Sequence, residues 1–554
     1  MANIRFVLFI ILAFLCFSLY QQWQLDYGPK PPVAGAPSTA ATTPGVAPAA
    51  DLPESSRTLD DVTAADRAPP QTASATVTPS AARIAVTTDV VRVEIDTVGG
   101  DLRLLELLQY PVAKDQPDNP VRLLNDGAEL FIAQSGFLGE TLIAPTHHDT
   151  WQAAAKQYQL DADQETLRVP LTWSNGKGVT VTKTFVFKRG SYLIGLEHAI
   201  DNRSGADWRA SQYVQLQRTD TSGRDSSQIV RSYTGGVLYT PEEKYEKISF
   251  KDMADRNLNR KAKNAWIAMI QHYFLAAWLP PTDQETLFYS KNLGEKRFLL
   301  GASAPQTLIP NGQAQTISTS LFAGPKLTRV LEATAPGLEL TVDFGGLTVV
   351  AKPIFWLLET FHKLFNNWGF AIIFVTLVIK ALFFKLSEAS YRSMANMRKL
   401  QPKLQELKER MGDDRQRYNQ AMMEMYRKEK VNPLGGCLPI LVQIPVFIAL
   451  YWVLAESVEL RQAPFLFWLD DLSARDPYFI LPFIMMVSMV IQQKLNPPPA
   501  DPVQAKVMQF FPYIFGGFFA FFPSGLVLYW VVNNVLSIIQ QWYITKQIEN
   551  PSKA

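Results

Sequence analysis

The apolar residues of this chain gather in two regions, which divides the sequence into membrane-type and soluble-type parts. One region is the short run 6–20, and the other is the chain after residue 347. Residues 51–325 have the composition of an ordinary soluble domain. Long apolar stretches are typical of helices that cross a bilayer, and 554 residues are enough for several domains. We therefore predict a multi-domain membrane protein.

Residues 1–27 are predicted to form an N-terminal transmembrane signal anchor. Arg5 precedes the apolar run Phe6 to Tyr20, as in a signal sequence. No pair of small residues that would mark a cleavage site follows Cys16, and no small residue precedes Cys16 as lipidation requires. The anchor should therefore stay uncleaved. The soluble part has no cysteine, because Cys16 and Cys437 both lie in or beside apolar segments.

Residues 28–82 are rich in Pro, Ala, Thr and Ser, so we expect a flexible linker. From Arg83 onward the pattern changes to strict alternation, with Val91, Val93 and Ile95 separated by polar residues. Such alternation predicts half-buried strands. Asn175-Gly176 is the best candidate for a type I′ hairpin turn. Residues 83–340 are accordingly predicted to form an all-β antiparallel sandwich.

The rest of the chain alternates apolar segments with short polar joints. Residues 353–366 place apolar side chains on one face and polar ones on the other, which suits a helix lying in the membrane interface. Residues 367–546 are predicted to form a five-helix transmembrane core. The candidate spans are Trp368–Phe384, Leu434–Leu454, Tyr478–Gln492, Val507–Phe522 and Ser524–Tyr543.

Basic residues indicate how this core is oriented. The segment 385–430 contains 12 Lys or Arg against 7 Asp or Glu, and Lys494 and Lys506 lie in the loop 493–506. Excess positive charge marks the cytoplasmic side of a membrane protein. This rule puts both segments and both chain termini in the cytoplasm, and the sandwich on the opposite side.

Residues 386–431 are predicted to fold as a cytoplasmic helical hairpin, because apolar residues recur at helical spacing on both sides of Gly412. The apolar seam offers a contact surface for an apolar peptide, although such spacing more often marks a helix–helix core. The candidate contact residues are Met397, Leu404, Met411, Met422 and Met425.

Lys380 is the one charged residue in the apolar run Trp368 to Phe384. A charge at the bilayer centre costs about 2.5–3.5 kcal/mol on insertion scales, so it usually faces a protein interior or a hydrated cavity. The alternative is that the lysine snorkels to the headgroups. Thr376, Gln443, Asn533 and Ser537 lie at comparable depths in their predicted helices. Because the outer halves are apolar, the pattern favours a groove open to the cytoplasm over a channel.

No enzyme motif is present: there is no phosphate-binding glycine loop, no His-Glu-x-x-His and no paired-cysteine metal site. For His147, His148 and His198, a hydrogen-bonded structural role is more common than metal binding. We expect no catalytic residue, no cofactor and no metal. Two other classes stay open, a small-solute transporter, which needs a midplane site and internal repeats, and an envelope receptor acting through the sandwich.

Three long motifs resemble the YidC/Oxa/Albino family of insertases, in the Gram-negative form with a large periplasmic domain. They are KEKVNPLGGCLP at Lys428–Pro439, SVELRQAPF at Ser457–Phe465 and FPSGLVLY at Phe522–Tyr529. The resemblance covers essentially the whole chain. It implies a signal anchor, a periplasmic β-supersandwich and a five-helix core that inserts newly made proteins into the inner membrane and helps them fold.

The resemblance also implies roles for individual residues. Lys380 occupies the position of a basic groove residue that is arginine in many members. The implied partners are nascent membrane proteins, the Sec translocon and the lipid bilayer, with the signal recognition particle receptor and the ribosome as further candidates and no direct contact with nucleic acid. The implied groove residues are Lys380, Thr376, Gln443, Phe447, Trp530, Asn533 and Ser537.

Overall fold

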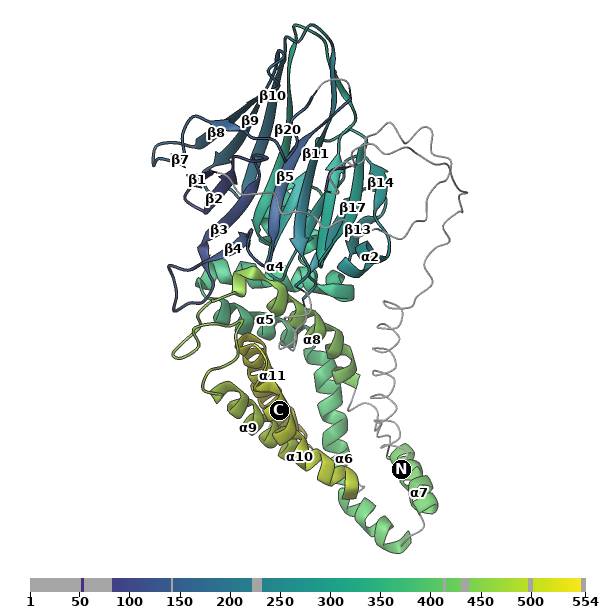
Figure 1. Cartoon of the computed structure of the whole chain (residues 1–554). Helices are drawn as coiled ribbons and strands as arrows, with labels where there is room; N and C mark the ends of the chain where they lie inside the picture. The colour runs from purple at the N-terminus through teal and green to yellow at the C-terminus, as the bar shows by residue number, and fades with distance from the viewer. Residues whose placement is uncertain are drawn as a thin grey trace, which may run out of the picture.

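The computed structural model describes residues 51–53, 82–140, 143–221, 232–411, 415–429, 438–496 and 502–549. The predicted signal anchor, residues 1–27, lies outside the described residues, as does most of the predicted linker. In the described part, a β sandwich stands on a group of helices (Figure 1).

One layer of the sandwich is an 11-stranded sheet in the order β14-β17-β18-β11-β5-β3-β2-β1-β7, with β19 paired to β11 and β4 to β3. All its pairings are antiparallel except β1 with β7. Its strands are β1 (Arg83–Thr87), β2 (Val91–Asp96), β3 (Leu102–Pro111), β4 (Pro120–Leu124), β5 (Phe131–Gly139), β7 (Gln157–Gln159), β11 (Trp208–Thr219), β14 (Asn259–Ala262), β17 (Thr286–Gly294), β18 (Arg297–Ser303) and β19 (Thr307–Ile309).

The other layer is a nine-stranded antiparallel sheet in the order β13-β12-β15-β16-β20-β10-β9-β8-β6. Its strands are β6 (Gln152–Ala153), β8 (Thr166–Ser174), β9 (Val179–Lys188), β10 (Leu193–Asn202), β12 (Gly235–Thr240), β13 (Lys244–Ile248), β15 (Trp266–Ile270), β16 (Phe274–Leu279) and β20 (Ala314–Pro325). The predicted all-β sandwich is confirmed.

The predicted alternation is what builds the sandwich core. Val91, Val93 and Ile95 of β2 are all buried, whereas Arg92 between them is exposed. Large side chains from both sheets, including Trp208 of β11, fill the space between the layers. Alternate burial of this kind is the packing expected of a sheet with one face on a core.

The hairpin at Asn175 forms, but its turn is not the predicted two-residue type I′. Ser174 pairs with Thr180, so the loop between β8 and β9 is longer. The Asn175 side chain accepts hydrogen bonds from the backbone N–H groups of Lys177 and Val179. This side-chain turn replaces the two left-handed residues that type I′ demands, and positive φ falls at Gly176 and Gly178 instead.

Helices account for most of the remaining described residues, and each of the five spans predicted after residue 367 contains one. The short helix α2 (Phe250–Asp255) is closed by a capping box from Ser249. The others, with three 3-10 turns, are α3 (Thr328–Thr334), η2 (Leu338–Thr341), η3 (Gly345–Leu347), α4 (Thr348–Phe365), α5 (Trp368–Leu382), α6 (Phe384–Met411), α7 (Arg415–Lys428), α8 (Leu438–Glu456), η5 (Val458–Leu460), α9 (Ile480–Leu495), α10 (Pro502–Phe519) and α11 (Ser524–Glu549).

Several helix ends differ from the sequence-based expectation for local physical reasons. The helix α9 begins at Ile480 and not at Tyr478, because Phe479 adopts a left-handed conformation with φ 57°. The Asp476 carboxylate supports this start by accepting from the N–H groups of Tyr478 and Leu481. The helix α10 begins earlier than predicted, at Pro502, a residue suited to the first turn. Within the described residues, no single helix is both long and apolar enough to span a membrane.

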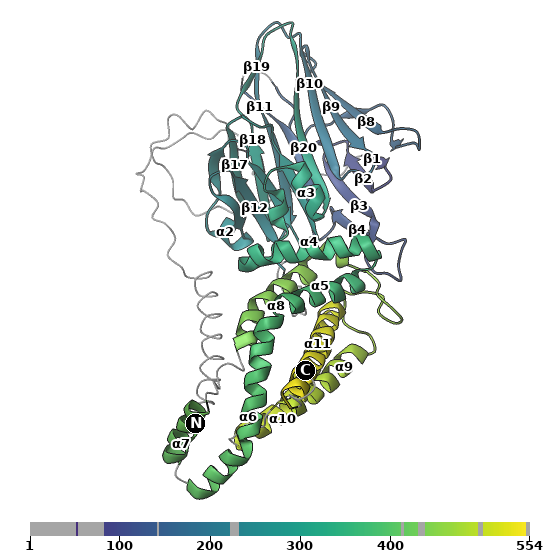
Figure 2. The same ribbon diagram turned by 180° about the vertical axis from the view of Figure 1, so that it is seen from behind.

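The bent pair α5 and α6 meets that length and composition test together, with an angle of 67° at the break. The sequence predicts one span, Trp368–Phe384, but α5 stops at Leu382. Phe383 adopts φ −92° and ψ 11°, outside the helical range, and its N–H donates to the carbonyl of Ile379. This break directs α6 and the hairpin away from the sandwich (Figure 2).

Direct contacts join the sandwich to the helices. Figure 2 shows α4 along the base of the sandwich. Arg329 of α3 forms an ion pair with Glu359 of α4. In the loop after α8, the Arg461 guanidinium donates to the carbonyl of Pro111 over 2.7 Å. Lys114 donates to the carbonyl of Asp470 over 2.8 Å. The segment 457–479 therefore lies on the sandwich side of the helical part.

Candidate functional site in the helical region

Lys380 lies in the last turn of α5 and is 8% exposed. Its ammonium nitrogen donates to the hydroxyl of Ser537 on α11 over 2.7 Å. The Ser537 hydroxyl in turn donates to the carbonyl of Asn533, also over 2.7 Å. Among the described residues, Lys380 has no carboxylate in ion-pair contact. The structure thus places a buried cation next to a neutral partner.

The polar face of α11 continues this contact toward the hairpin. Gln540, about one turn beyond Ser537, donates to the carbonyl of Phe384 over 3.3 Å. Phe384 is the first residue of α6. Successive turns of α11 therefore contact both sides of the α5–α6 break.

Aromatic side chains form a second, apolar part of the site. The ring of Phe447 on α8 lies 4.9 Å from that of Trp530 on α11. Trp530 also contacts Phe519 of α10, at 5.6 Å between ring centres. These contacts bring α8, α10 and α11 together. Both Phe447 and Trp530 are half-buried, so each still offers part of its surface.

The remaining predicted groove residues are placed differently from one another. Thr376 is fully buried, and its hydroxyl donates to the carbonyl of Ile372 in its own helix over 2.7 Å. Gln443 on α8 and Asn533 on α11 are half-buried. The structure thus joins Lys380 to Ser537 and Phe447 to Trp530, whereas Thr376 is satisfied within α5.

Asn534 is a polar residue of the core that the sequence analysis does not single out. It is buried, and its amide donates to the Ser488 hydroxyl of α9 over 3.1 Å. Ser488 lies inside an apolar helix at a depth similar to that of Asn534. This similarity in depth could have predicted the contact from the sequence, because buried polar groups in an apolar helix bundle usually form hydrogen bonds with each other.

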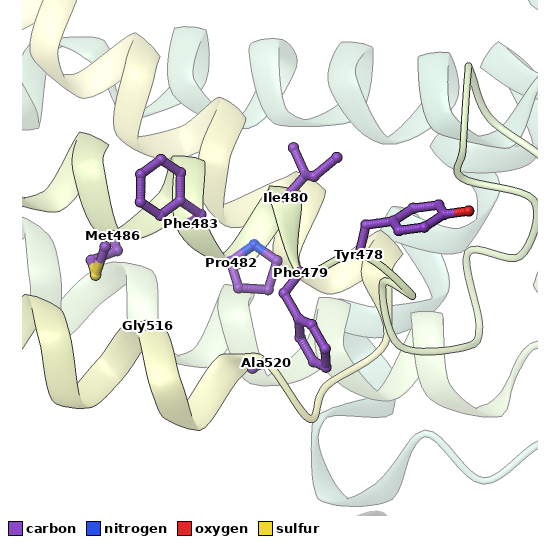
Figure 3. A pocket seen from close by; sticks show the side chains of 8 residues that line it. All are labelled: Tyr478, Phe479, Ile480, Pro482, Phe483, Met486, Gly516 and Ala520. Carbon is purple, nitrogen blue, oxygen red and sulfur yellow. The ribbon is translucent and has the colours of Figure 1, made fainter.

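The helices α9 and α10 carry an exposed apolar surface. Its side chains include Phe483, Ile514 and Phe518, all more than half exposed. Figure 3 shows a shallow hollow on this surface. It is lined by Tyr478, Phe479, Ile480, Pro482, Phe483, Met486, Gly516 and Ala520. Neighbouring exposed apolar side chains of this kind are typical of a surface that contacts lipid or protein.

The predicted hairpin is formed by α6 and α7, which pack on each other. Lys403 and Glu429 join the two arms by an ion pair of 2.7 Å. Met397, Leu404, Met422 and Met425 are each partly exposed, and the side chain of Met411 lies outside the described residues. The seam thus keeps some apolar surface accessible after the two arms have packed.

One acidic group of the junction with the sandwich has a shifted pKa. Glu459 lies in η5, outside the apolar helices. Burial raises the pKa of its carboxyl to about 7, although backbone N–H groups, including that of Thr328, partly offset the effect. Its Oε2 atom has no hydrogen-bond partner in the described structure. A buried carboxyl in this state favours the proton-bearing form.

Comparisons with known proteins agree with this architecture. Residues 83–357 match the family described as YidC periplasmic domain, and residues 360–551 match the family described as 60Kd inner membrane protein. The chain is 66% identical over 552 residues to a membrane protein insertase YidC of Methylococcus capsulatus, covering 99% of each chain. It is 48% identical over 554 residues to one of Nitrosococcus oceani, again covering 99% of each.

A crystal structure described as an active YidC insertase with the first transmembrane domain resolved is 19% identical, with a TM-score of 0.39, covering 84% of this chain and 93% of that one. The family assignment rests on the two matched domains and on the full-length relatives. This chain, with its periplasmic β sandwich and its helical inner-membrane region, belongs to the YidC family of membrane protein insertases.

Proposed function

We propose that Lys380 receives the polar or acidic part of a newly made membrane protein, which enters from the cytoplasm. The apolar part of the client then moves outward along the apolar helix faces. A hydrated cation partway through the bilayer lowers the cost of bringing a short polar segment into the membrane. No covalent chemistry is needed for this step, so the protein acts as an insertase and chaperone and not as an enzyme.

The observation that carries the proposal is the Lys380–Ser537 contact. A buried ammonium with a carboxylate partner would be neutralised within the protein, whereas here the described partner is a hydroxyl. The positive charge therefore stays available to a client carboxylate. Ser537, Asn533, Gln443, Phe447 and Trp530 complete the proposed groove, and Thr376 supports the packing of α5 behind it.

We further propose that the chain crosses the inner membrane several times, with both termini in the cytoplasm and the sandwich in the periplasm. The loop 457–479 touches the sandwich through Arg461. The hairpin of α6 and α7 projects from the opposite end (Figure 1). These two placements agree with the distribution of basic residues along the sequence.

The proposed partners follow from the same arrangement. Exposed apolar faces on α9 and α10 suit contact with lipid or with the Sec translocon. The insertase would act together with the translocon on some clients and alone on others. The basic hairpin suits incoming chains, the signal recognition particle receptor and the ribosome. Its partly exposed Met397, Leu404, Met422 and Met425 would contact apolar client segments, as would Met411.

A crosslinking experiment tests the groove. A photocrosslinker at Gln443, which is half-buried on α8, should capture a stalled membrane-protein chain. The same crosslinker at Leu308, which is 46% exposed on the sandwich, serves as the control. Equal capture at both positions would contradict a specific groove.

Depletion of the protein separates the proposal from the other two classes. Newly made small membrane proteins should stay uninserted while solute uptake stays normal. Normal insertion with impaired uptake would favour a small-solute transporter. If depletion affected only responses to an external ligand, an envelope receptor acting through the sandwich would be favoured instead.

A further inference from the structure

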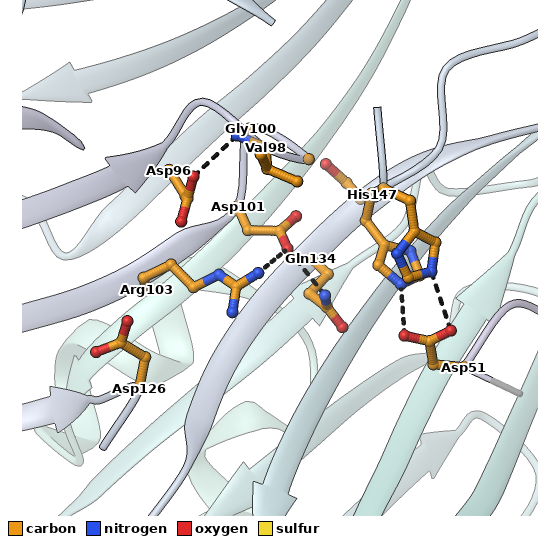
Figure 4. A network of polar contacts seen from close by, with 12 residues as sticks. Asp51, Asp96, Val98, Gly100, Asp101, Arg103, Asp126, Gln134 and His147 are labelled. Atoms are coloured by element: carbon orange, nitrogen blue, oxygen red, sulfur yellow. Dashed lines mark hydrogen bonds and ion pairs between the residues drawn. The ribbon is translucent and has the colours of Figure 1, made fainter. Parts of the chain in front are cut away.

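Two neighbouring histidines of the sandwich and one aspartate of the linker meet at a single point. The Asp51 carboxylate lies 3.0 Å from His147 Nε2 through one oxygen and 3.0 Å from His148 Nε2 through the other. The three ligand atoms lie within 4.8 Å of one another. Figure 4 shows Asp51 facing the imidazole of His147. In the described part of the chain, this is the one group of three or more such side chains close enough to share an ion.

The side chain of His147 is held in place from its other side. It is fully buried, and its Nδ1 atom lies 2.6 Å from the hydroxyl of Tyr213 on β11. The backbone N–H of His147 also donates to that hydroxyl, over 3.1 Å. A metal-binding histidine usually has a hydrogen-bond partner on its second nitrogen, which sets the direction of the first. Tyr213 has that position here.

Asp51 is also fixed through its main chain, although it precedes the first strand by about thirty residues. The Gln215 amide donates to the Asp51 carbonyl over 3.1 Å, and Lys291 donates to the carbonyl of Leu52. Gln215 is itself held by the Tyr289 hydroxyl over 2.9 Å. Residues 51–53 of the predicted linker are therefore seated on the sandwich, and the carboxylate of Asp51 is directed at the two imidazoles.

We propose that Asp51, His147 and His148 bind a divalent transition-metal ion, with Zn²⁺ as the best fit. Two imidazoles and one carboxylate are a frequent ligand set for zinc, which keeps a fourth position for water. Metal–ligand distances of about 2.0–2.1 Å place tetrahedral ligand atoms about 3.3 Å apart. The two 3.0 Å separations, one to each carboxylate oxygen, need to open by about 0.3 Å, and the wider separations, of up to 4.8 Å, need to close by about 1.5 Å, which a rotation of the partly exposed His148 side chain can supply. The His148 side chain is 32% exposed, which leaves a route for the ion and the water.

The ion would fasten the linker to the sandwich. His147 and His148 belong to the folded domain, whereas Asp51 lies 96 residues before His147. Metal binding would therefore close a long loop between Asp51 and the two histidines. Zinc availability would thereby set how strongly residues 51–53 are held on the sandwich.

Zinc titration of the purified full chain tests the proposal. The protein is prepared in detergent without a polyhistidine tag, stripped with a chelator and titrated with Zn²⁺ by calorimetry, and bound metal is counted by mass spectrometry. We expect one Zn²⁺ per chain. Asp51→Ala and His148→Ala should each weaken binding at least tenfold. Co²⁺ in place of Zn²⁺ should give the visible absorption of a tetrahedral site, and both variants should lose it.

His272→Gln is the matched control, because His272 is another partly exposed sandwich histidine and lies outside the cluster. It should bind Zn²⁺ like the parent chain. Asp51→Ala also leaves Nε2 of the buried His147 without its described partner, so its stripped form should melt at a lower temperature, and Zn²⁺ binding is compared at a temperature where all the variants are folded. Failure of the parent chain to bind one Zn²⁺, or equal binding by Asp51→Ala, would overturn the proposal and leave a clamp held by hydrogen bonds alone.

Discussion

The ammonium nitrogen of Lys380 lies 2.7 Å from the hydroxyl oxygen of Ser537 and joins the last turn of α5 to the middle of α11. A hydroxyl satisfies one of the three ammonium donors without cancelling the charge. The contact therefore holds the cation in position and leaves it able to attract an acidic group. This combination is unusual for a buried lysine, since buried charges are normally paired.

Removal of the charge at position 380 should impair insertion. Lys380→Ala should lower the insertion of clients with a short acidic tail about tenfold, because a charge-assisted hydrogen bond contributes about 1.5–3 kcal/mol. Lys380→Arg should retain most activity, because the charge is kept. Lys385→Ala is the control, since Lys385 is a lysine whose side chain is 91% exposed. Protease protection of the client in vesicles measures the outcome, and full activity of Lys380→Ala would remove Lys380 from the mechanism.

Loss of the hydroxyl at position 537 should mainly affect stability. Ser537→Ala leaves the buried ammonium without its described partner, so the free energy of unfolding should fall by about 1–3 kcal/mol. Thermal unfolding in detergent checks this. Insertion should fall less than in Lys380→Ala, because the charge remains. A double variant, Lys380→Met with Ser537→Ala, should recover stability without recovering insertion; additive losses of stability would argue against direct coupling.

Part of this site follows from the sequence. Lys380 and Ser537 lie at similar depths in apolar helices, and buried polar groups tend to meet, so their contact was predictable in kind. The place of Thr376 was not, because a threonine in a helix can satisfy its hydroxyl on the carbonyl four residues earlier, as it does here with Ile372. The break at Phe383 carries neither proline nor glycine to mark it in the sequence, so the position of Phe384 next to Gln540 was not predictable either.

The fold shows the same division between local and distant causes. The strands around Val91 and Val179 follow from alternation, because a period of two is a local property of the chain. The conformation of the Asn175 loop was not predictable in this way, because the same residues can form either a two-residue turn or a longer loop closed by the Asn175 side chain. The pairing of β11 with β5 and the seating of Asp51 on His147 join segments far apart in sequence, so no local pattern contains them.

Added bulk at Gly369 should destabilise the start of α5. A Cβ atom there would lie 2.0 Å from Cδ2 of the Phe465 ring. The main chain of Phe465 is held in place, because its carbonyl accepts from the Asn367 side-chain amide over 3.2 Å. Gly369→Ala should lower the free energy of unfolding by about 1–3 kcal/mol, as overpacking does. Adding Phe465→Leu should recover part of the loss. Gly517→Ala on α10 is the control, because a Cβ there meets nothing within 4 Å; an equal loss in both would disprove the steric cause.

Glu459 should make stability depend on pH near neutrality. Its carboxyl has a pKa raised to about 7 by burial, from an ordinary value of 4.5. A group whose pKa is higher in the folded state stabilises the fold fully below the unfolded pKa and loses that contribution as pH rises through the folded pKa. The free energy of unfolding should therefore fall by up to about 2–3 kcal/mol between pH 4.5 and pH 7.5. Thermal unfolding in detergent across that range measures it.

Glu459→Gln removes the titrating group and keeps the shape of the side chain. The free energy of unfolding of this variant should therefore lose this part of the pH dependence, and above pH 7 it should be larger than that of the parent chain. Glu332→Gln on α3 is the matched control, because that carboxyl is exposed, and its pH profile should follow the parent chain. The two variants should differ because the Oε2 atom of Glu459 is buried with no partner in the described structure. Ionisation of Glu459 therefore has a desolvation cost that the exposed Glu332 carboxylate avoids. A Glu459→Gln profile parallel to that of the parent chain would assign the pH dependence to other groups.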